Sequence, residues 1–184
     1  MLTLEKKSNS LSKLNGLPEI SLERALSRLA SSMTRAAAET AGAFFCTKTS
    51  EGASWEVPRL SYQESIFCSQ INMGEKYEML CNLAVDKSDW TKMFTSGESD
   101  LFQMDTFCEL ANCICGTVLA DPSFADEFGN LIPCVPFSGV SAQGHPGSKT
   151  FRGAFRLSGF LVHFSFTVQE CSICAVNHPQ SVAA

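Results

Sequence analysis

The spacing of apolar residues along the chain predicts two long helices joined by shorter elements. Apolar side chains recur at helical spacing within residues 19–45, where Gly42 is the expected end of the helix. A second helical stretch covers roughly residues 100–120 and stops at Asp121-Pro122. Between the two, Ser88 is the expected N-cap of a short helix.

Strand patterns account for most of the remaining chain. Residues 61–71 and 77–85 flank a glycine-bearing turn, which predicts a β-hairpin. Residues 149–157 and 160–168 predict a second hairpin around Ser158-Gly159, because the last run alternates apolar and polar side chains. An extended stretch lies between them, at residues 131–140. Its two prolines, Pro133 and Pro136, confine it to a sheet edge or to an irregular strand. Two further stretches, residues 47–60 and 123–130, are expected to be loops.

The element order is helix, hairpin, short helix, long helix, strand, hairpin. It lacks the regular strand-helix alternation of a doubly wound sheet, and it predicts an α+β domain. We expect a mainly antiparallel sheet with the two long helices packed on one face. Residues 18–170 form this domain, and residues 1–17 and 171–184 are expected to be flexible tails.

Composition narrows the function classes. The chain has 184 residues, 45% of them hydrophobic and 18% charged, which is enough apolar material for one core. The net charge is −5, so no basic surface is available for nucleic acid. No segment has the pattern of a signal peptide or a membrane span, and the nine cysteines are odd in number. These features predict a cytoplasmic protein with reduced thiols and no membrane partner.

The second long helix carries two stripes at helical spacing. One is apolar and is the expected core face: Phe107, Leu110, Ala111, Ile114 and Val118. The other contains two acids, an amide and a glycine: Asp105, Glu109, Asn112 and Gly116. A glycine inside a helix costs about 1 kcal/mol relative to alanine, which favours a packing or functional reason for it. By spacing alone, this stripe is either a solvated helix face or a site.

This stretch resembles the CheC/CheX/FliY family of chemotaxis phosphatases. The family signature is an Asp or Ser, three residues, Glu, two residues and Asn, followed later by a proline. Asp105, Glu109 and Asn112 match it in type and spacing. The proline departs from the signature, which places it about twenty-two residues after the Asn. Here Pro133 follows Asn112 after twenty residues and Pro136 after twenty-three. We favour Pro133, because the stretch Ile132-Pro133-Cys134-Val135 resembles the opening of the corresponding strand in the family. A Gly144-His145 turn offers a further, weaker similarity.

The chain has one copy of the motif, whereas CheC proteins usually carry two, so CheX is the more similar branch. The resemblance implies a homodimer joined through the sheets and a partner, the phosphorylated receiver domain of a CheY-like response regulator. It implies that Asn112 positions the attacking water and that Glu109 pairs with a lysine of the regulator. Asp105 and Gly116 would contact the partner, although Asp105 equally suits helix capping. The Mg²⁺ would belong to the regulator, so no cofactor is expected here. The alternative is a non-catalytic module that binds a receiver domain.

Two other groups of residues are candidates for chemistry. Cys171-x-x-Cys174 with His178 has half of a zinc-site spacing, and Cys113-x-Cys115 is the one conceivable second pair. The competing interpretation is a loose chain end without metal, and a thiol or metal sensor would require stoichiometric metal. His163 lies on the polar side of the last strand and is expected to be a surface or helix-covered residue, without a catalytic role.

Overall fold

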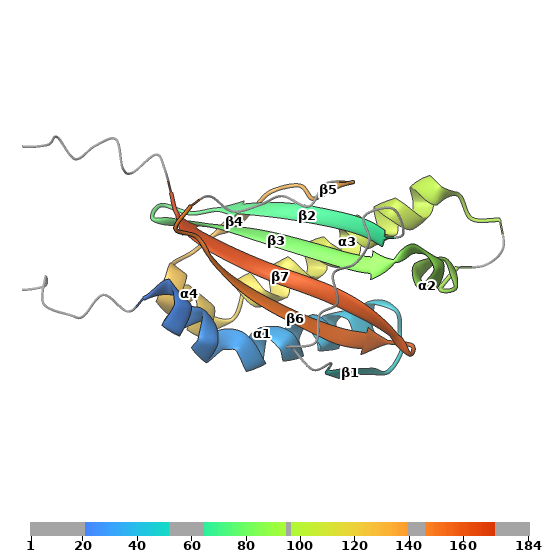
Figure 1. The fold of residues 1–184 in the computed structure, drawn as a ribbon, viewed down its shortest axis with the longest axis horizontal. Coiled ribbons are helices and arrows are strands. Elements are labelled where there is room, and N and C mark those ends of the chain that lie inside the picture. Colours follow the sequence, from blue (N-terminus) through green and yellow to red (C-terminus); the bar gives the residue numbers. More distant parts are fainter. Residues whose placement is uncertain (1–20, 52–64, 95–96, 140–145, 172–184) are drawn as a thin grey trace, which may run out of the picture.

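A computed structural model describes residues 21–51, 65–94, 97–139 and 146–171. Within them lie four helices and seven strands, shown in Figure 1. The helices are α1 (Leu22–Phe44), α2 (Lys87–Thr91), α3 (Asp100–Leu119) and α4 (Pro122–Phe128). The strands are β1 (Thr49–Glu51), β2 (Ser65–Met73), β3 (Tyr77–Asp86), β4 (Ile132–Pro133), β5 (Phe137–Ser138), β6 (Lys149–Leu157) and β7 (Phe160–Glu170).

The strands form one antiparallel sheet in the order β1-β6-β7-β3-β2-β4, and β5 also pairs with β2. The two predicted hairpins, β2-β3 and β6-β7, are confirmed and meet at the centre through β3 and β7. Helix α1 packs against β6, α3 packs against β2, and the two helices contact each other. The predicted α+β class, with both long helices on one face of the sheet, is therefore confirmed (Figure 1).

The core lies between this helical layer and one face of the sheet. The apolar face predicted for the last strand is confirmed, because Val162, Phe164, Phe166 and Val168 are all buried in the core cluster. The other face is less exposed than predicted, since His163 and Thr167 are buried as well. The apolar stripe predicted for α3 is buried in the same cluster: Phe107, Leu110, Ala111, Ile114 and Val118. Burial of this stripe fixes the rotation of α3 about its axis, so the opposite stripe must face outward.

Contacts at both ends of α3 hold the helix in place. At its start the Ser99 hydroxyl caps the helix by accepting a hydrogen bond from the Phe102 amide at 3.2 Å. The buried Trp90 ring donates from Nε1 to the Gln103 carbonyl at 3.1 Å and packs edge-on against Phe107. Near the other end, hydroxyl groups of α1 and α3 form a hydrogen bond of 3.0 Å. The helix is thereby a rigid platform for the side chains on its outer face.

Two predicted helix ends were wrong. Gly42 does not end α1, which continues to Phe44; a Cβ at residue 42 would lie 3.0 Å from the Thr47 carbonyl oxygen. The glycine serves the close approach of the following chain, rather than a left-handed cap. Ser88 is not the N-cap of α2 either. Asp86 is, because its carboxylate accepts hydrogen bonds from the two amides that follow Lys87.

Two stretches predicted as loops contain regular structure. Residues 123–130 include most of α4, which Asp121 caps and which has a proline in its first turn. Residues 47–60 include β1, at the far edge of the sheet. The predicted tail 1–17, residues 172–184 of the predicted tail 171–184, residues 61–64 and the Gly144-His145 turn lie outside the described residues. Cys171 was wrongly placed in that tail, because it is buried and its amide donates to the Lys76 carbonyl at 2.8 Å. No helix among those described is long and apolar enough to cross a membrane.

Candidate functional site

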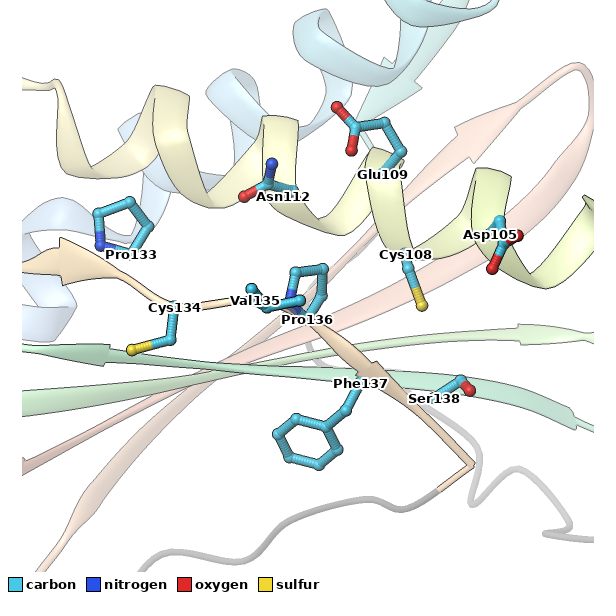
Figure 2. A pocket seen from close by; sticks show the side chains of 10 residues that line it. All are labelled: Asp105, Cys108, Glu109, Asn112, Pro133, Cys134, Val135, Pro136, Phe137 and Ser138. Atoms are coloured by element: carbon cyan, nitrogen blue, oxygen red, sulfur yellow. The ribbon is translucent and has the colours of Figure 1, made fainter.

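A cavity of about 760 Å³ lies beside α3, at the edge of the sheet. Helix α3 contributes Asp105, Cys108, Glu109 and Asn112, and the opposite wall is the extended segment 133–138. Figure 2 shows this segment running alongside the helix, with the Cys134 and Phe137 side chains pointing away from α3. Three of the four polar-stripe residues predicted from spacing therefore line one cavity. Gly116 does not line it.

Short pairings with β2 place the extended wall. Pro133 of β4 pairs with Asn72 of β2, and Phe137 of β5 pairs with Ser69 of β2. Between these pairings, the Cys134 amide donates to the Ile71 carbonyl at 3.1 Å. The expectation of an irregular edge strand is correct. Both prolines, Pro133 and Pro136, line the cavity, so the geometry leaves the choice between them open.

The cavity wall carries negative charge. Asp105 and Glu109 are exposed, and no Lys or Arg is among the lining residues. Neither carboxylate forms an ion pair with a described residue. Glu109 Oε1 accepts one long contact from the Cys113 thiol, at 3.8 Å. A carboxylate this exposed and without a cation partner suits a positively charged group brought by another molecule.

Asn112 is half-buried and accepts a hydrogen bond from Gln70, which in turn contacts Asn72; the sequence interpretation missed both of these amides. Gln70 Nε2 donates to Asn112 Oδ1 at 3.4 Å and to Asn72 Oδ1 at 3.2 Å. Gln70 and Asn72 are both fully buried on β2. A signal for them exists in the sequence. In residues 65–73, the positions that alternate with Ser65 and Phe67 are Ile66, Cys68, Gln70 and Asn72, so two amides occupy core-facing positions.

Three thiols in or beside the cavity, those of Cys68, Cys108 and Cys113, are poor nucleophiles at neutral pH. Cys68 Sγ lies 3.4 Å from Cys108 Sγ, and burial raises the pKa of both thiols above the ordinary value. Burial and the neighbouring Glu109 carboxylate raise the pKa of Cys113 as well. A protonated thiol reacts slowly, so these three cysteines are poor candidates for nucleophilic catalysis; Cys134, which also lines the cavity, is exposed.

The other candidates gain no support as sites. His163 is buried, burial lowers its pKa, and its partners in the β-ladder are Ala84 and Ala154, so no carboxylate stands opposite it. Its predicted surface or helix-covered position is wrong in detail, because it lies buried on the sheet face opposite the core. Cys174 and His178 lie outside the described residues, and within those residues no cluster of three or more potential ligands could hold a metal ion.

Comparison with solved structures identifies the fold. Chemotaxis protein CheX from Vibrio vulnificus matches with a TM-score of 0.61 at 8% identity, over 77% of this chain and 99% of that one. CheX from Desulfovibrio desulfuricans matches with a TM-score of 0.56 at 15% identity, over 77% and 99%. CheX from Borrelia burgdorferi, solved as a CheX-CheY-BeF3-Mg²⁺ complex, matches with a TM-score of 0.56 at 13% identity, over 76% and 97%.

The chain therefore has the fold of the CheX and CheC-like proteins, as the motif resemblance predicted. The matches are recognisable in structure at identities of 8–15%, so they establish the fold and leave the chemistry to the residues of the site. No protein-family model matches the sequence, and no curated protein matches it.

Proposed function

We propose that this chain is a phosphatase acting on the phospho-aspartate of a CheY-like receiver domain. The observation that carries the proposal is the joint position of Glu109 and Asn112. They stand one turn apart on α3 at a single cavity beside the sheet edge. The fold it shares with a CheX that was solved in complex with CheY, BeF3 and Mg²⁺ supports the choice of partner.

The cavity suits a reaction that needs positioning more than covalent help. Hydrolysis of phospho-aspartate requires one water in line with the phosphorus–oxygen bond, and transfer of the phosphoryl group to that water releases inorganic phosphate. An amide can hold the water without any pKa adjustment, and we assign this role to Asn112. The described lining residues include no histidine, and this reaction needs neither a histidine nor a thiol nucleophile.

Glu109 would dock the partner. Its exposed carboxylate is available for a charge-assisted hydrogen bond with a lysine beside the phosphate of the receiver domain. Asp105, one turn earlier on the same face, adds negative charge to the same side of the complex. Magnesium, which neutralises phosphoryl charge in such reactions, would be held by the receiver domain and not by this chain.

Apolar side chains on the extended wall provide the rest of the proposed docking surface. Ile132, Val135 and Phe137 are exposed, Val135 to 85%. Large apolar residues beside a polar cavity are typical of protein interaction sites. We also expect a homodimer joined through the sheets and a cytoplasmic location.

The test is the lifetime of a phosphorylated receiver. CheY-like receivers from the same genome are phosphorylated with acetyl phosphate carrying ³²P, freed of the donor, and followed with Mg²⁺ and a twentieth of an equivalent of this chain. We expect a shortened lifetime and stoichiometric release of phosphate. Unchanged lifetimes, together with measurable binding to receivers loaded with beryllofluoride, would replace the phosphatase with the non-catalytic module. If the chain neither shortens the lifetime nor binds the loaded receivers, the proposal is overturned altogether.

Gly116 offers a separate prediction. A Cβ at this position would meet no described atom within 4 Å, so the glycine has no packing role in the isolated chain. Gly116→Ala should therefore raise the free energy of unfolding by about 1 kcal/mol, as measured by urea denaturation. If the partner approaches the backbone here, the same variant should also bind the beryllofluoride-loaded receiver more weakly. A more stable variant with unchanged affinity would remove Gly116 from the partner-binding residues.

A further inference from the structure

Three side-chain amides connect the backbone of β3 to the cavity. Asn72 Nδ2 donates to the Met79 carbonyl at 3.2 Å, and Asn72 Oδ1 accepts from Gln70 Nε2 at 3.2 Å. The same Gln70 nitrogen donates to Asn112 Oδ1 at 3.4 Å. Asn112 is the only one of the three that lines the cavity. The chain of contacts thus begins in the sheet core and ends at the residue to which we assign the attacking water.

The orientation of each amide follows from the one before it. A backbone carbonyl only accepts, so the Asn72 atom that faces Met79 must be the nitrogen. The other end of that amide is then an oxygen, which requires the nitrogen of Gln70 to face it. The Asn112 atom that faces the Gln70 nitrogen must in turn be the oxygen. This logic removes the usual ambiguity between amide oxygen and nitrogen.

Asn112 is consequently held with its oxygen inward. Oδ1 uses one of its two lone pairs on Gln70, while Nδ2 donates to no side chain or backbone group among the described residues. The two N–H groups therefore remain available in the cavity. A side chain held in one orientation positions a water better than one that rotates, because the cost of ordering it has already been met in folding.

Stability alone does not account for Gln70. Its side chain is 0% exposed, and its Oε1 accepts no hydrogen bond from the residues described. A buried acceptor without a partner costs about 1–3 kcal/mol. The preceding core-facing positions of β2 carry Ile66 and Cys68, so an apolar residue would fit the pattern of the strand. An amide at this position is therefore a cost to the fold that a role at the cavity would explain.

We propose that Gln70 is a positioning residue for Asn112, oriented in turn by Asn72. The proposal rests on the proposed function for its catalytic meaning, because Asn112 must act on the reaction for its orientation to affect the rate. A purely structural Gln70, which only links β2 to α3, would affect stability without separating turnover from substrate binding. The two roles therefore predict different results for the same variant.

The test uses Gln70→Met, which keeps the length of the side chain and removes the donor. Asn72→Leu removes the anchor, leaves Gln70 in place, and substitutes for the first variant if that one does not fold. Ser69→Ala is the matched control, because Ser69 is buried on the same strand and its hydroxyl bonds to Asn82 rather than to Asn112. For each chain, kcat and KM are measured with phosphorylated receiver.

We expect Gln70→Met to lower kcat about tenfold while KM stays within about twofold, and Asn72→Leu to have a smaller effect of the same kind. Ser69→Ala should leave both constants unchanged. A folded Gln70→Met with the kcat of the unmodified chain would overturn the proposal. Equal losses in the Ser69→Ala control would assign the effect to disturbance of β2, and would overturn it too.

A second measurement does not depend on activity. NMR on the full chain without partner reports both side-chain torsions of Asn112: three-bond couplings to Cγ give the χ1 rotamer, and NOEs from the Nδ2 protons show which way the amide faces. We expect one rotamer in the unmodified chain and averaging over several in Gln70→Met. If the chain dephosphorylates no receiver, the proposed function fails, and these couplings still decide whether Gln70 orients Asn112. A single unchanged rotamer in Gln70→Met would overturn the orienting role even in an active phosphatase.

Discussion

Asn112→Ala should abolish dephosphorylation of the receiver domain while binding survives. The substitution removes the amide that we assign to the attacking water, and loss of a positioned group costs roughly 100-fold or more in turnover. The fold should tolerate the change, because Asn112 is half-buried and Gln70 Nε2 keeps its bond to Asn72. Single-turnover decay of the ³²P-labelled receiver measures the rate, and titration with the beryllofluoride-loaded receiver measures the affinity.

The matched control is Asn130→Ala, an exposed amide outside the cavity lining. It should leave both rate and affinity unchanged. Phosphate release from Asn112→Ala at the rate of the unmodified chain would remove Asn112 from the chemistry. A parallel loss of rate and affinity would assign Asn112 to docking instead, and the mechanism would need another residue to hold the water.

Glu109→Lys should have the largest effect on binding. Reversing this charge places a lysine against the positive group that we expect on the partner, so attraction becomes repulsion. The neutral Glu109→Gln should weaken affinity roughly tenfold, which corresponds to about 1.4 kcal/mol, and Glu109→Lys should weaken it further. Affinity is measured by titration with the beryllofluoride-loaded receiver at two salt concentrations, because a charge pair at the surface is screened by salt.

Asp126→Lys serves as the control, since Asp126 is exposed on α4 and does not line the cavity. It makes the same change in net charge as Glu109→Lys, so comparison of the two separates a local contact from the overall field. Equal weakening by both variants would contradict the docking role of Glu109. At saturating concentrations Glu109→Gln should retain much of its turnover, because Asn112 is still in place.

Long periodic segments were predictable because their patterns repeat often enough to be distinct. The two stripes of α3 were assigned from spacing, and the apolar one is buried as predicted, which places Asp105, Glu109 and Asn112 at the surface. The hairpins were predictable because clear alternation flanks glycine-bearing turns. The resemblance seen in the motif agrees with the fold, which matches a CheX structure over 77% of the chain. The sequence identity to that structure is only 8%, and no family model matches the sequence.

Shorter and non-local features were not predictable in the same way. Helix α4 has seven residues, too few for a period, and the Pro122 that ends one helix also begins the next. The role of Gly42 depends on the close approach of Thr47 from beyond the helix end, which spacing within the helix cannot reveal. The amides of Gln70 and Asn72 are visible in the strand pattern, but their link to Asn112 depends on how α3 crosses β2.

The prolines of the extended wall restrict what kind of molecule can bind at this edge of the sheet. The N–H group of Cys134 points inward, toward the Ile71 carbonyl of β2. Because successive residues of an extended chain alternate in direction, the N–H groups of its neighbours would point outward, toward the open edge of the sheet. Pro133, one of these neighbours, has no N–H group to offer on the outer side. An incoming extended peptide would find few donors for a ladder, so β-augmentation is disfavoured. Recognition here must rely on side chains, which selects a folded surface over an unfolded segment.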